Sequence, residues 1–98
     1  GYQILALRDE GAIKSVAGFR YAEFLYCGPI IYIDDLATLP GQMCKGYASA
    51  VLDWVIAHAR TRQCRAVHLD SGYSRHTAHK LYLRKGFVLN AHHFALEL

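Results

Sequence analysis

A short glycine-bearing loop is the part of this chain whose residue types most directly suggest chemistry. The loop, Gln42–Gly46, joins an apolar segment that ends at Leu39 to a segment of helical periodicity. The first backbone N–H groups of a helix have no intrahelical partner, and the helix macrodipole adds about half a positive charge at that end. Gly46 lets the backbone approach a ligand closely, and Gln42 and Lys45 can add side-chain contacts. Because such a helix end stabilises a phosphate, the sequence predicts that a phosphorylated cofactor binds at this junction.

A tyrosine further along the chain is a second candidate, because its phenol can donate a proton. Tyr82 lies within Ala78-His79-Lys80-Leu81-Tyr82-Leu83-Arg84-Lys85-Gly86-Phe87. Residue type alone favours an aromatic side chain packed beside Leu81. Taken with the loop, however, this segment resembles the two signature segments of the GNAT N-acetyltransferase superfamily, which uses acetyl-coenzyme A. The resemblance covers most of the chain.

The loop departs from the family pattern at two positions. The family's phosphate loop reads Gln/Arg-x-x-Gly-x-Gly/Ala, commonly within Arg-Gly-x-Gly-x-Gly/Ala. In this chain Gly46 and Ala48 match the last two small residues of the pattern. Met43 and Cys44 stand where the family usually has Arg and Gly. Loss of the arginine removes a charge-assisted bond to pyrophosphate, on the order of 1.5–3 kcal/mol, or roughly tenfold to a hundredfold in affinity. A side chain at Cys44 costs on the order of 1 kcal/mol or more if the position needs a positive φ. We therefore expect cofactor binding to be weakened without being abolished.

The resemblance implies direct transfer of an acetyl group from acetyl-coenzyme A to a primary amine of a small molecule or a peptide. This reaction needs a neutral amine, stabilisation of a tetrahedral oxyanion and protonation of the departing thiolate. By resemblance, Tyr82 protonates the sulfur, the strand before the loop pairs with the pantetheine arm, and an N–H near Leu36 meets the oxyanion. The cofactor-binding residues expected on this basis are Leu36, Ala37, Thr38, Gln42, Met43, Cys44, Lys45, Gly46, Tyr47 and Ala48.

Acidic side chains on the strands are candidates for the general base or the amine anchor. Asp34 and Asp35 point to opposite faces if side chains alternate along their strand, so at most one of them can face a groove. Asp35 and Glu23 are the catalytic candidates chosen on this basis, and each is also consistent with an exposed or paired strand residue. Further base candidates are His68 and Asp70.

The altered loop leaves a second class of function open. The alternative is a non-catalytic member that keeps the fold as a coenzyme A sensor or an oligomerisation module, because fold does not dictate function. Acetyl transfer that depends on Tyr82 would reject this alternative.

Composition and charge argue against several other classes of protein. The 98 residues, 53% hydrophobic and 19% charged, suit one domain spanning residues 1–98 with a buried core. A net charge of +3 suits a polyanionic small ligand but is too slight to indicate nucleic acid or membrane binding. Three widely spaced cysteines, with no secretory signal or bilayer-length apolar run, indicate a reduced cytoplasmic protein. No zinc-ligand spacing such as Cys-x-x-Cys is present, so no metal site is expected.

The hydrophobic periodicities predict the elements that position these residues. Strands are expected at Tyr2–Arg8, Ala12 to about Tyr26, Ile30–Leu39, Cys64–Asp70 and Phe87–Leu98. Helices are expected at about Lys45–Arg62 and at His76–Lys85, the second ended by Gly86. The first helix has an apolar face made of Ala48, Val51, Leu52, Val55 and Ala59. The predicted fold is α/β (α+β), a GNAT-like mixed, mostly antiparallel sheet with the order β-β-β-α-β-α-β.

Relative to the family pattern, the chain is N-terminally incomplete. GNAT domains usually carry a first strand and a helical pair before this series, and those elements help to wall the acceptor site. Without them, Tyr2–Leu7 presents an apolar sheet edge, which proteins commonly cover by pairing with another chain. We therefore expect a homodimer, or another partner, that covers this edge.

Overall fold

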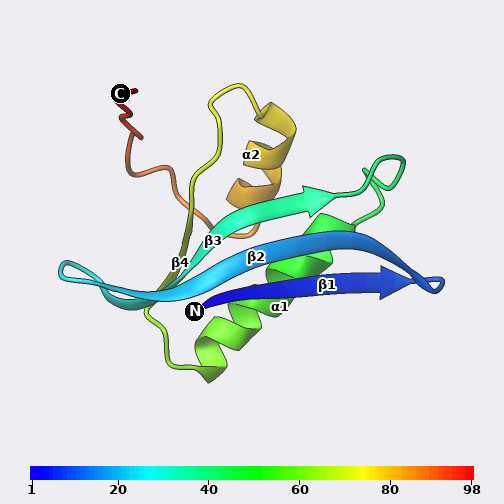
Figure 1. Cartoon of the computed structure of the whole chain (residues 1–98), viewed down its shortest axis with the longest axis horizontal. Helices are drawn as coiled ribbons and strands as arrows, with labels where there is room; N and C mark the ends of the chain where they lie inside the picture. The colour runs from blue at the N-terminus through cyan, green and yellow to red at the C-terminus, as the bar shows by residue number, and fades with distance from the viewer.

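The computed structural model describes residues 1–98 and contains a four-stranded sheet and two helices (Figure 1). Along the chain the elements are β1 (Tyr2–Asp9), β2 (Ala12–Phe24), β3 (Gly28–Thr38), α1 (Tyr47–Thr61), β4 (Ala66–Leu69) and α2 (His76–Arg84). The strands lie in the order β1-β2-β3-β4; β2 is antiparallel to both of its neighbours, and β4 is parallel to β3. The predicted mixed, mostly antiparallel sheet is confirmed.

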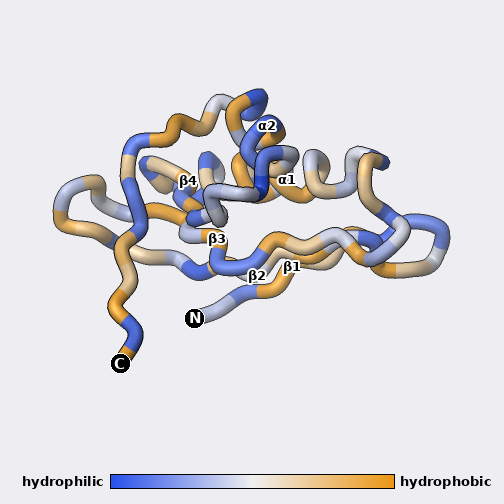
Figure 2. Tube along the Cα trace, turned by 90° about the horizontal axis from the view of Figure 1, so that it is seen from above, coloured by the Kyte–Doolittle hydropathy of each residue, from blue (hydrophilic) through white to orange (hydrophobic).

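The buried core lies between the sheet and one face of α1. The buried residues of this helix are Val51, Leu52, Val55 and Ala59, and they pack against apolar side chains of β2 and β3. The strand residues of the same cluster are Ala17, Phe19, Ile31 and Ile33. Figure 2 shows the helices and the sheet as two facing layers. Helical spacing therefore predicted the buried face of α1, except that Ala48 is only half-buried.

A β-bulge interrupts the pairing of β2 with β3. Gly18 pairs with Asp35, but the next residue, Phe19, pairs with Ile33, so Asp34 is the extra residue on β3. Ile33 belongs to the core cluster and Leu36 packs against it. Because Ile33 and Leu36 both face the core, the two aspartates between them share the opposite side of the strand. The simple alternation assumed for Asp34 and Asp35 is therefore wrong at this point.

The end of α2 has the glycine geometry that its sequence predicts. Gly86 has φ 98, its N–H donates to the carbonyl of Leu83, and the N–H of Phe87 donates to the carbonyl of Tyr82, both at 3.1 Å. These two bonds form a Schellman motif, which satisfies the last carbonyls of the helix. The motif also brings the Phe87 ring to 6.0 Å from the Tyr82 ring, measured between centroids.

The predicted final strand does not form. Residues 87–98 contain no regular secondary structure, and the side chains of Phe94, Leu96 and Leu98 are exposed. A groove of about 600 Å³ is lined on one side by residues 64–70 and on the other by residues 85–91. Neighbouring strands must lie about 4.8 Å apart to exchange hydrogen bonds, so a segment across this groove cannot pair with β4. The sheet therefore ends at β4, and the expected order loses its last strand.

Candidate functional site

Strands β3 and β4 diverge, and a cavity opens where they part. Their pairing covers only Ile30–Ile33 of β3 and Ala66–Leu69 of β4, so β3 continues from Asp34 to Thr38 without a neighbour on that side. The cavity at this point has a volume of about 170 Å³. Its lining consists of Ile33, Asp34, Asp35, Leu36, Ala37, Leu69, Asp70, Arg75 and Tyr82. The cavity therefore combines an unpaired strand edge, carboxylates, a phenol and a guanidinium.

The loop that follows β3 leaves backbone donors free at the start of α1. Ala50 donates the first helical hydrogen bond, to the carbonyl of Gly46 at 3.0 Å, so the N–H groups of Tyr47–Ser49 have no backbone acceptor. Gly46 has φ 81 and provides no side-chain cap, and the first helical turn contains no acidic residue. These N–H groups and the positive end of the helix can therefore accept an anion.

The side chains of this loop differ in exposure. Met43 and Cys44 are exposed, and Cys44 has φ 62, in the left-handed region that favours glycine. The condition under which a side chain at this position is costly is therefore met. Lys45 is also exposed, whereas the side-chain Oε1 atom of Gln42 is buried without a hydrogen-bond partner. An amide oxygen in this state can accept a hydrogen bond from a ligand or from a rearranged loop.

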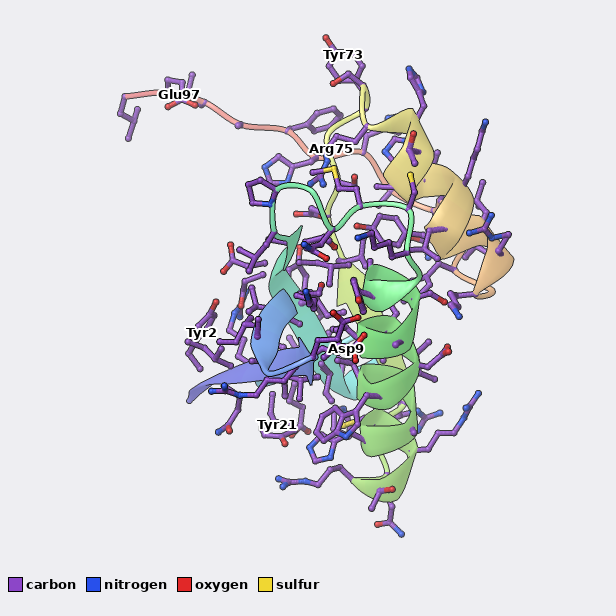
Figure 3. All side chains as sticks on the ribbon, turned by 90° about the vertical axis from the view of Figure 1, so that its right-hand side faces the viewer. Tyr2, Asp9, Tyr21, Tyr73, Arg75 and Glu97 are labelled. Atoms are coloured by element: carbon purple, nitrogen blue, oxygen red, sulfur yellow. The ribbon has the colours of Figure 1, made fainter.

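Tyr82 is the buried phenol of the cavity lining. It is 8% exposed and belongs to the core cluster. Burial raises the pKa of the Tyr82 phenol, and the nearby positive charge of Arg75 partly opposes this shift. Arg75, labelled in Figure 3, comes from the segment immediately before α2. The phenol therefore keeps its proton at neutral pH in a cavity that also contains the edge of β3.

Asp34 and Asp35 both line the cavity, but they have different partners. The guanidinium of Arg20 donates to Asp34, with its Nε atom 3.0 Å from Oδ2. The Tyr2 hydroxyl donates to Oδ2 of Asp35 at 2.5 Å. Asp34 is therefore paired with a cation, whereas Asp35 keeps an uncompensated negative charge beside a neutral donor.

The structure separates the other base candidates. Asp70 lines the cavity, and its Oδ2 atom lies 3.1 Å from Nδ1 of His93. His68 lines the groove on the outer side of β4 and not this cavity. Glu23 pairs with Pro29 near the opposite end of β3, about five residues along the sheet from the Gly18–Asp35 pair, and it lines neither space. The structure therefore does not bring Glu23 to Tyr82.

Three contributors to the site were missed from the sequence. Ser15 is fully buried, and its hydroxyl donates to the carbonyl of Ala37 at 2.9 Å, which fixes the diverging end of β3. A polar residue inside an apolar strand was the available signal for Ser15. Arg75 and Tyr2 reach the site by tertiary placement, and no local pattern marks them.

No group of three metal-ligating side chains comes together, and neither helix has the length and apolar composition needed to cross a bilayer.

Comparison with known proteins identifies the class of this fold and site. Residues 1–87 match the model of the acetyltransferase (GNAT) family, so the chain belongs to that family. It is 32% identical over 94 residues to the uncharacterized N-acetyltransferase YhdJ of Bacillus subtilis, covering 95% of this chain and 66% of that protein. The chain thus spans about two thirds of the length of this curated relative.

Solved structures agree on the fold. An aminoglycoside acetyltransferase from an uncultured soil metagenomic sample is 20% identical, with a TM-score of 0.85 over 99% of this chain and 66% of that one. A putative acetyltransferase from Agrobacterium tumefaciens is 25% identical, with a TM-score of 0.86 over 100% of this chain and 69% of that one. AAC(6′)-Iy, solved with a bisubstrate analogue that contains coenzyme A, is 15% identical and has a TM-score of 0.85, covering 99% of this chain and 69% of that one.

Proposed function

We propose that this protein transfers an acetyl group from acetyl-coenzyme A directly to a primary amine. The observation that carries the proposal is the cavity between β3 and β4, where a buried phenol, the free edge of β3 and carboxylates meet, together with the uncapped start of α1 that follows β3. Membership of the acetyltransferase family and similarity to an N-acetyltransferase support it. A structural relative bound to a coenzyme A analogue supports the choice of donor.

The proposed binding of acetyl-coenzyme A uses the loop and the free edge of β3. The N–H groups of Tyr47–Ser49 donate hydrogen bonds to the pyrophosphate, and Gln42 and Lys45 add side-chain contacts. The unpaired backbone at Leu36–Thr38 binds the pantetheine amides as an added strand would. This arrangement directs the thioester toward Tyr82, because β3 runs from the cavity to the loop.

The proposed reaction needs three proton transfers. A carboxylate removes a proton from the acceptor ammonium, and the neutral nitrogen attacks the thioester carbon, with an N–H near Leu36 stabilising the oxyanion. The carbon–sulfur bond then breaks, Tyr82 protonates the thiolate, and the amide nitrogen loses its second proton to water. We assign the carboxylate role to Asp35 because Asp34 is held by Arg20. Asp70 is the second choice, and Glu23 is not used because it lies outside the cavity.

A panel assay tests this function. The protein is incubated with acetyl-coenzyme A and, separately, with a peptide amine, lysine, an aminoglycoside and a polyamine, while free thiol and acetylated product are measured. We expect stoichiometric coenzyme A and acetylated amine with at least one acceptor class. Thiol release without an acetylated amine indicates hydrolysis alone, and that result, or silence with every acceptor, contradicts the proposal.

A second candidate is favoured by one observation. Cys44 occupies a left-handed conformation in the loop, and an exposed methionine precedes it where the family has arginine. A weakened loop is consistent with a non-catalytic coenzyme A sensor or an oligomerisation module. Ligand binding that persists without acetyl transfer would favour this alternative.

The three unpaired cysteines fit a reducing compartment such as the cytoplasm for either role.

We further propose that two copies of the chain associate through the outer edge of β1. This strand is at the edge of the sheet, and Tyr2 and Ile4 are 52% and 71% exposed. The accessible surface is 7299 Å², compared with about 5,600 Å² for a typical folded monomer of this mass. A standard interface buries roughly 800 Å² on each partner, so the excess surface of one chain is large enough to supply one such interface. Light scattering should give twice the 11.0 kDa chain mass, and a monodisperse monomer at micromolar concentration contradicts the proposal.

A further inference from the structure

The hydrogen bond between Tyr2 and Asp35 crosses an intervening strand. Tyr2 lies on β1 opposite Arg20 of β2, and Asp35 lies on β3 opposite Gly18 of β2. The Tyr2 side chain therefore passes over β2 to reach the aspartate, on the side of the sheet away from α1 (Figure 3). A contact between two strands that are not neighbours needs a gap in the side chains of the strand between them.

Gly18 provides that gap. A Cβ atom placed on Gly18 would lie 1.6 Å from the Tyr2 hydroxyl oxygen and 2.4 Å from the adjacent ring carbon. Gly18 does not have a positive φ, so its backbone conformation does not require glycine. Glycine is therefore needed at this position because the Tyr2 ring occupies the space that a side chain would fill.

The bulge places this contact at the cavity. Gly18 is the β2 residue beside the bulge, so the partner of Gly18 is the aspartate that lines the cavity. Arg20, two residues further, holds Asp34 by an ion pair. The two neighbouring carboxylates are thus fixed by different means: a cation neutralises one, and a neutral phenol orients the other without removing its charge.

We propose that Tyr2, seated over Gly18, is a positioning residue that holds the Asp35 carboxylate toward the acceptor amine. The inference rests on the proposed function, because it assumes that Asp35 receives the amine. An aspartate with no partner populates several rotamers, and one short hydrogen bond to Oδ2 selects one of them. Oδ1 of Asp35 then remains available to an ammonium group, which is why a neutral donor suits this position better than a cation.

Two substitutions remove the contact by different routes. Tyr2→Phe deletes the hydroxyl, whereas Gly18→Ala leaves the tyrosine intact but displaces its ring. Each should lower kcat/KM for the acceptor amine about fivefold to tenfold, because a hydrogen bond to a charged group is lost at an exposed site. The KM for acetyl-coenzyme A should not change. The kcat/KM of the double variant should be no lower than that of Gly18→Ala alone, because both substitutions break the same interaction.

A matched control and a spectroscopic measurement separate positioning from a general effect on the fold. Tyr26→Phe removes the hydroxyl of an 80% exposed tyrosine in the β2–β3 turn and should leave all kinetic constants unchanged. The hydrogen bond to Asp35 is the largest cause that raises the pKa of Tyr2 above its ordinary value, followed by burial and the charges of Asp35 and Asp34. In protein labelled with ¹³C at tyrosine Cζ, Asp35→Asn should therefore lower the pKa of the Tyr2 resonance.

The outcomes distinguish this inference from the proposed function. Wild-type protein that acetylates an amine, with variants that keep wild-type kcat/KM, overturns the positioning role alone. Equal losses toward the acceptor and acetyl-coenzyme A, with a lower Tm, also overturn it, because they indicate a structural role. An unchanged Tyr2 titration in Asp35→Asn refutes the contact itself. Wild-type protein that acetylates no amine overturns both the inference and the function on which it depends.

Discussion

Replacing Tyr82 with phenylalanine is expected to lower kcat for acetyl transfer about 100-fold, the low end of the range for a lost general acid. A thiolate leaves readily only when a proton reaches its sulfur, and Tyr82 is the buried phenol in the cavity. Affinity for acetyl-coenzyme A should change little, because the ring that packs beside Phe87 is kept. Stopped assays of amide formation measure kcat, and calorimetry measures the affinity.

The same role for Tyr82 predicts the direction in which kcat changes with pH. Burial raises the pKa of Tyr82 above 10.0, and the phenol must be protonated to act as the acid. On the alkaline side, the kcat of the wild-type protein should therefore fall only as pH rises beyond 10.0, and this alkaline limb should be absent in Tyr82→Phe. Tyr73→Phe, at a 90% exposed position outside the cavity, is the matched control. A Tyr82→Phe variant that turns over at the wild-type rate shows that another group protonates the sulfur.

Restoring the family's residues in the loop, Met43→Arg with Cys44→Gly, is expected to raise the affinity for acetyl-coenzyme A. The arginine adds a charge-assisted bond to pyrophosphate worth about 1.5–3 kcal/mol, which is roughly tenfold to a hundredfold in Kd. The glycine removes the cost of a side chain at φ 62, on the order of 1 kcal/mol. The two effects should combine in a calorimetric titration of the double variant beside the wild-type protein.

A charge-matched control identifies the origin of any gain in affinity. Leu25→Arg adds the same cation at a fully exposed position in the β2–β3 turn, at the end of β3 opposite the loop. General attraction of a polyanion would improve binding in both variants and would be screened by salt. An affinity in the loop variant no higher than in Leu25→Arg contradicts a pyrophosphate site at residues 42–48.

Local signals were sufficient for the features that depend on one segment. The apolar spacing along α1 predicted its four buried residues, because a helix buries side chains at a fixed period. Gly86 predicted the end of α2, because the Schellman geometry needs a left-handed residue there. Cys44 has the positive φ on which the expected cost of a side chain at this position depends.

Features that depend on two distant segments were not predicted. The bulge that puts Asp34 and Asp35 on one side arises from the pairing register of β2 with β3, which alternation along β3 alone does not contain. The contact from Tyr2 over Gly18 depends on three strands at once. Alternating apolar residues after Phe87 showed that this segment could be a strand, but pairing also needs a neighbouring edge within hydrogen-bond distance.

The proposed function depends on the backbone amides at the start of α1 binding the diphosphate of coenzyme A, and these amides can be observed directly. In ¹⁵N-labelled protein titrated with coenzyme A, we expect the largest amide shifts at residues 44–49, together with shifts at Leu36–Thr38. Pantetheine, which lacks the diphosphate, should move only the Leu36–Thr38 group. Saturating coenzyme A that leaves the amides of Tyr47–Ser49 unshifted would contradict the assignment of this helix end as the diphosphate site.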